Sequence, residues 1–121
     1  MNTQTEKLKG ICNSVLQIDS SIRFVGIISE GGKLIESAKR EHTTYLLDKE
    51  EESLSLIHTS VKASMHKLWD EILGKTSWTI ALKQKVKLIT VFLDSKLLVL
   101  STETTADHDK ILEKIQDVIL V

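Results

Sequence analysis

The spacing of apolar residues changes several times along the chain, and each change marks a different element of secondary structure. Between residues 4 and 18 apolar side chains recur every three or four positions, which predicts a first helix. Residues 22–29 are almost continuously apolar and rich in β-branched side chains, which predicts a strand covered on both faces. The glycine-containing turn at 30–32 allows a tight hairpin, so residues 33–38 are predicted to return as a second, charged edge strand.

A long amphipathic helix is predicted next. Asp48 and Glu51 have the spacing of a capping box, and Gly74 has the position of a glycine that ends a helix. At 1.5 Å per residue this helix would be about 37 Å long, whereas a seven-residue strand covers only about 23 Å. We therefore expect one end of the helix to extend beyond the sheet. The helix carries one apolar stripe, expected to pack on the sheet: Leu54, Ile57, His58, Val61, Met65, Leu68, Trp69 and Ile72.

Three further strands and a final helix follow. Residues 76–82 alternate between large apolar and small or polar side chains, as in a strand with one buried face. Residues 86–93 and 97–100 are apolar on both faces and are predicted to be central strands. The last helix is expected to begin at a cap from Thr105 or Asp107. Its stripe consists of Ile111, Leu112, Ile115, Val118 and Ile119.

The order of these elements, αββαβββα, predicts an α+β fold built on one sheet. Short hairpin connections make neighbouring strands antiparallel, and the first and fifth strands are the two that can pair on both sides. The sheet is therefore a five-stranded antiparallel sheet in the order 2-1-5-4-3. One long helix covers one face, and the first and last helices cover the other. A chain of 121 residues is expected to form a single domain over residues 1–121.

Composition narrows the possible partners and the compartment. Sixteen basic and seventeen acidic side chains give a formal net charge of −1, which argues against nucleic acid as a partner. The single cysteine cannot form an internal disulfide, and the sequence shows no signal peptide, so a cytoplasmic location is expected. No apolar run approaches the roughly 20 residues of a membrane-spanning helix, so no insertion into a membrane is expected.

The hairpin sequence Val25–Ser37, VGIISEGGKLIES, resembles the roadblock/LC7 family of profilin-like domains, and the order of elements matches that family over nearly the whole chain. The chain is also similar to short archaeal roadblock-like proteins. The resemblance implies a homodimer formed through the second helix and third strand. It further implies a non-enzymatic regulatory or scaffold protein for a small Ras-like GTPase or a larger complex.

The residues themselves support a dimer through the same elements. Small side chains lie beside the apolar stripe of the long helix and would let two helices approach closely. Trp78 begins the less protected edge strand, and large aromatic side chains are frequent interface anchors. The predicted dimer interface consists of Ser53, Ile57, Ser60, Ser64, Trp78, Thr79, Ile80 and Ala81. The alternative is a monomer with a polar helix flank and a tryptophan in its core.

One basic cluster, Lys83, Lys85 and Lys87, lies at the turn between the third and fourth strands. It is either a solvated hairpin tip or a docking patch for an acidic partner, or it makes a weak contact with anionic lipid or phosphate. Residues 31–32 lack the spacing of a phosphate loop, so their glycines are interpreted as a hairpin turn.

Neither catalytic residues nor a cofactor or metal site is predicted. His58 and His66 are about 12 Å apart along one helix, too far to share an ion, and Cys12 lies on a buried stripe. The sequence therefore contains no group of residues that would indicate an enzyme. A PAS- or Cache-like sensor of a small molecule remains the alternative function.

Overall fold

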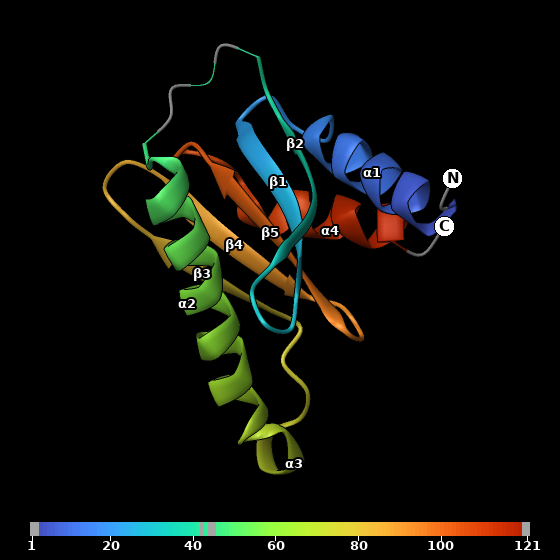
Figure 1. Ribbon diagram of the computed structural model, residues 1–121, viewed down its shortest axis with the longest axis vertical. Coiled ribbons are helices and arrows are strands. Elements are labelled where there is room, and N and C mark those ends of the chain that lie inside the picture. Colours follow the sequence, from blue (N-terminus) through green and yellow to red (C-terminus); the bar gives the residue numbers. More distant parts are fainter. Residues whose placement is uncertain (1–2, 42, 44–45, 120–121) are drawn as a thin grey trace.

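The computed structural model describes residues 3–41, 43 and 46–119 of the chain, and that part contains three helices longer than one turn, one short helix and five strands. Figure 1 shows their arrangement. In chain order the elements are α1 (Thr3–Leu16), β1 (Ile22–Ser29), β2 (Leu34–Lys39), α2 (Lys49–Lys67), α3 (Asp70–Leu73), β3 (Trp78–Leu82), β4 (Lys87–Phe92), β5 (Lys96–Thr102) and α4 (His108–Ile119).

The five strands form a single sheet in the order β2-β1-β5-β4-β3, and all four neighbouring pairs are antiparallel. This confirms the strand order that the sequence predicts. The central strands β1 and β5 each have a partner on both sides, so the edges of the sheet are β2 and β3. Because β3 pairs with β4 alone among the described strands, its outer backbone groups are available to another strand.

The two faces of the sheet are covered unequally. The helices α1 and α4 lie on one face and form most of the core with the strands beneath them, from Cys12 and Val15 in α1 to Ile111 and Ile115 in α4. The helix α2 lies on the other face. Its contact with the sheet is a smaller cluster, composed of Ile28, Leu56, Ala63, Leu97 and Val99 with the partly buried Phe24 and Phe92.

The predicted long helix is present but interrupted. The capping box at its start is confirmed, because Glu51 N donates to Asp48 Oδ1 at 2.8 Å and Asp48 N donates to Glu51 Oε1 at 3.0 Å. The helix breaks after Lys67, and the single turn α3 follows before Gly74, whose φ of 92° ends it. Figure 1 shows α3 projecting beyond the end of the sheet, as the predicted helix length requires.

The turn between β1 and β2 touches α2 directly. Gly32 N donates to Ser29 O at 2.9 Å, and Gly32 has a φ of 88°, a conformation that L side chains rarely adopt. A Cβ atom on Gly32 would lie only 2.7 Å from the Cα atom of Ile57. Both the turn and the close approach of α2 therefore require glycine at this position.

Replacement of Gly32 by alanine should lower the free energy of unfolding by about 2 kcal/mol or more, because it combines a strained φ with a clash against the α2 backbone. Urea denaturation measures this change. The matched control is Gly31→Ala, since an added Cβ there meets nothing closer than 3.9 Å and the φ is not positive. Equal stability of the two variants would contradict the assigned role of Gly32.

Candidate interaction surface

The apolar stripe of α2 faces solvent in the protomer. Leu54, Ile57, Val61, Met65 and Leu68 are between 47% and 76% exposed. The expectation that this stripe packs on the sheet is therefore wrong. Burying a side chain of this size stabilises a protein by about 1.5–3 kcal/mol, so five of them in water represent a large unused driving force.

A narrower face of α2 contacts the sheet instead. It consists of Leu56, Ser60 and Ala63. Ser60 is only 5% exposed, and its Oγ donates to the backbone oxygen of Ile57 at 3.0 Å, which satisfies the hydroxyl inside the helix. The small side chains of Ser60 and Ala63 let the helix lie close to the strands. Ser60, predicted at the dimer interface, thus lies within the protomer, whereas Ser53 and Ser64 are exposed between the two faces.

The exposed stripe is symmetric along the helix. Val61 is its centre, with apolar residues four positions before and after it, and again seven positions before and after it. The outer pairs are Ile57 with Met65 and Leu54 with Leu68. Two antiparallel copies of such a helix, related by a twofold axis at Val61, would place Ile57 opposite the partner's Met65 and Leu54 opposite the partner's Leu68.

The side chains of β3 divide between the two faces of the sheet. Ile80 pairs with Ile89 and packs on the core under α1 and α4, and Trp78 pairs with Val91, which belongs to the same core. Directly paired residues point to the same face, so Trp78, Ile80 and Leu82 face away from α2. Thr79 and Ala81 face the α2 side. The predicted interface residues of β3 are therefore brought to one edge, but they lie on two faces.

A second group of exposed apolar residues lies where α2 ends. This α3 tip consists of Leu68, Trp69, Ile72 and Leu73, which are between 57% and 79% exposed. Figure 1 shows this segment beyond the sheet. The sequence predicts that the helix overhangs, but it does not predict that these four side chains gather at one projecting end.

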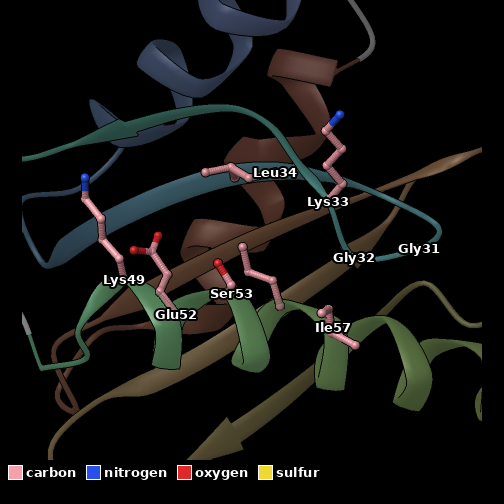
Figure 2. Close-up of a pocket in the computed structure, with 9 residues that line it drawn as sticks. Gly31, Gly32, Lys33, Leu34, Lys49, Glu52, Ser53 and Ile57 are labelled. Carbon is pink, nitrogen blue, oxygen red and sulfur yellow. The ribbon is translucent and has the colours of Figure 1, made fainter.

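A groove lies between the β1–β2 turn and the first half of α2 (Figure 2). Its volume is about 500 Å³, and this hairpin groove is lined by Gly31, Gly32, Lys33, Leu34, Lys49, Glu52, Ser53, Leu56 and Ile57. Apolar side chains from both walls, two lysines and the carboxylate of Glu52 give it a mixed lining. Sequence reasoning missed this groove, because it depends on the distance between two elements that are far apart along the chain.

The three lysines predicted to form one docking patch lie in different environments. Lys83 and Lys85 are exposed at the turn between β3 and β4. Lys87 is only 7% exposed, its Nζ donates to the backbone oxygen of Ala106 at 2.8 Å, and it lies 3.1 Å from His108 Nδ1. The exposed basic patch therefore contains two lysines, while Lys87 anchors the segment before α4.

The remaining polar groups form no recognisable reaction site. Within the described residues, no three histidine, cysteine, aspartate or glutamate side chains gather as a metal site would require. No helix in this part of the chain is long and apolar enough to cross a membrane. Cys12 is fully buried, and this burial, with a smaller effect of the Glu36 charge, raises the pKa of its thiol to about 11.

Comparison with solved structures places this geometry in a known fold. The gliding protein MglB of Thermus thermophilus shares 12% identity at a TM-score of 0.81, over 98% of this chain and 87% of that chain. An MglB with a tetrameric arrangement shares 13% identity at a TM-score of 0.81, over 98% and 86%. A Roadblock/LC7 domain from Streptomyces avermitilis shares 11% identity at a TM-score of 0.74, over 93% and 92%.

The chain therefore has the roadblock/LC7-like fold that its hairpin sequence indicates. No protein-family model and no curated protein matches the sequence.

The thiol of Cys12 should be almost inert in the folded protein. With a pKa of about 11 against an ordinary value of 9.0, the folded state holds about 100-fold less thiolate at pH 8 than the unfolded chain. Reaction with a chromogenic disulfide reagent should be at least that much slower before denaturation than after it. The unfolded thiol ionises first, so stability should fall as the pH rises from about 9 towards 11. Rapid labelling of the native protein would contradict this assignment.

Proposed function

We propose that this protein is a non-enzymatic regulatory or scaffold protein of roadblock type that acts as a homodimer. The observation that carries the proposal is the exposed apolar stripe of α2. Monomeric proteins rarely expose a contiguous apolar patch larger than a few hundred Å². A stripe of five large side chains on one helix is therefore best explained as one half of an interface.

A second copy of the chain is the partner that fits the stripe best. In an isologous dimer centred on Val61, a residue before the centre meets the partner's residue the same number of positions after it, and the stripe is apolar at both positions. Ser53 and Ser64 border the stripe, so they would allow the helices to approach. One solved structure of this fold, an MglB, has a tetrameric arrangement, which supports the proposal.

The edge strand β3 can extend the same interface. Two copies of β3 paired antiparallel about Ile80 would join the sheets and satisfy the outer backbone groups. Trp78 would then lie opposite the partner's Leu82, an apolar pair on the face away from α2. Thr79 and Ala81 would lie on the α2 face, where their small size leaves room for the paired helices.

The dimer would serve as a docking platform. The resemblance of the hairpin sequence to roadblock proteins favours a small Ras-like GTPase or a larger complex as the docked partner. Lys83 and Lys85 extend from the end of β3 and provide a basic contact for an acidic surface.

The second candidate function is a sensor of a small molecule. The observation that favours it is the hairpin groove, whose volume of about 500 Å³ lies in the usual range for ligand sites. In a screen of metabolites a ligand that fills the groove would raise the melting temperature.

Replacement of Val61 by glutamate should convert the dimer into monomers, because it buries two carboxylates against each other at the twofold axis. We expect the dissociation constant of the dimer to rise at least 100-fold relative to the unchanged protein. Light scattering at micromolar concentration should then give the mass of a monomer. Lys62→Glu is the control, since Lys62 is exposed outside the stripe of the same helix and its change should leave the dimer intact. A monomeric mass for the unchanged protein would contradict the proposal.

Replacement of both Lys83 and Lys85 by glutamate should weaken capture of a Ras-like GTPase from a lysate by about tenfold at low salt. Capture should differ between GTP-analogue and GDP conditions, and mass spectrometry identifies the captured protein. The variant Lys7→Glu with Lys9→Glu in α1 carries the same change in charge at exposed positions elsewhere and serves as the control. Unchanged capture by the first variant would exclude these lysines from the contact.

A further inference from the structure

The α3 tip is the most exposed apolar group of the described residues, and the α2 stripe does not account for it. Trp69, Ile72 and Leu73 lie beyond the symmetric part of the stripe, in the segment that projects past the sheet. The same turn carries two carboxylates, Asp70 and Glu71. The tip is thus a short helix that combines large apolar side chains with negative charge.

The hairpin groove has the complementary character. Leu34, Leu56 and Ile57 supply apolar walls, and the charged lining consists of Lys33, Lys49 and Glu52 (Figure 2). At one end of the groove the backbone of Gly32 lies against that of α2 at Ile57. With two ammonium groups against one carboxylate, the groove suits an apolar segment whose acidic groups lie beside the lysines.

The symmetry of α2 brings these two features together. In an antiparallel pair centred on Val61, a residue a given number of positions after the centre lies beside the residue the same number before it. The tip spans 7 to 12 positions after Val61, and the α2 residues of the groove, from Lys49 to Ile57, lie 4 to 12 positions before it. The tip of one copy and the groove of the other thus occupy the same stretch of the paired helices.

We propose that in the dimer the α3 tip of each copy fills the hairpin groove of its partner. Ile72 and Leu73 enter between the partner's Leu34 and the partner's Ile57, while Asp70 and Glu71 face the partner's lysines at the rim. This inference rests on the proposed homodimer. It assigns the groove an occupant from the chain itself, and it makes each site incomplete until a second copy binds.

Disulfide trapping tests this contact. Two single-cysteine proteins are prepared in a Cys12→Ala background, one with Ser53→Cys in the groove and one with Ile72→Cys in the tip. Oxidation of their mixture should give a covalent dimer on a non-reducing gel, because the two Cα atoms would come within the roughly 4.4–6.8 Å of a disulfide. We expect at least tenfold more of this dimer in the mixture than in either protein alone. Two copies of residue 53 would lie about 24 Å apart along the paired helices, too far to bridge.

The variant Val61→Cys, oxidised alone, separates this inference from the dimer on which it rests. If Val61→Cys forms a covalent dimer and the mixture does not, the tip is free for another partner and the inference is overturned, while the dimer stands. If neither forms one, the proposed dimer fails as well.

A second measurement does not depend on disulfide geometry. Ile72→Ser should weaken the dimer by about tenfold in sedimentation equilibrium, because it removes a buried apolar side chain from two symmetric contacts. Lys75→Ser, just outside the tip, is the matched control and should leave the dissociation constant unchanged. Equal dissociation constants for the two variants would overturn the inference.

Discussion

The rest of the structure depends on the way α2 meets the sheet. Ser60 and Ala63 allow the helix to lie close to the strands, and Gly32 receives it so closely that no Cβ would fit. Because small side chains occupy the face of α2 that contacts the sheet, most of its large apolar side chains lie on the face that points away from the sheet. The stripe centred on Val61 is the consequence, and it leaves the protomer with an apolar surface that its own sheet cannot cover.

The two faces of the sheet show the same division. On one face, α1 and α4 bury the centres of their apolar stripes, including the thiol of Cys12 and the side chain of Ile115. On the other, α2 buries few residues, and it extends past the end of the sheet into α3. The first face provides the stability of the fold through a conventional core. The second face leaves most of the apolar area of its helix uncovered in the protomer.

The fold was predictable because it depends on the spacing of apolar residues within each element and on the short connections between elements. The alternating and continuous apolar runs locate every strand. The hairpin connections make neighbouring strands antiparallel and favour one strand order. The rotation of α2 was not predictable, since a stripe such as Leu54 to Leu68 indicates burial without indicating what covers it. Lys87 shows the same limit, because Lys83 and Lys85 are exposed while the ammonium group of Lys87 reaches Ala106, a contact set by β4 and the segment before α4. The hairpin groove also lies between elements that are distant in the sequence, so no local pattern of residues indicates it.

A twofold dimer of this fold also constrains how a partner could dock. Pairing of two β3 strands about Ile80 would place the two copies of Lys83 about 20 Å apart, three residues beyond the axis on either side. The lysines at positions 83 and 85 would then form two basic patches, one at each end of the paired strands. A globular partner that reached from one patch to the other would exclude a second partner. In the proposed dimer a single partner bound in this way would occupy both subunits, whereas two partners per dimer would each contact one patch.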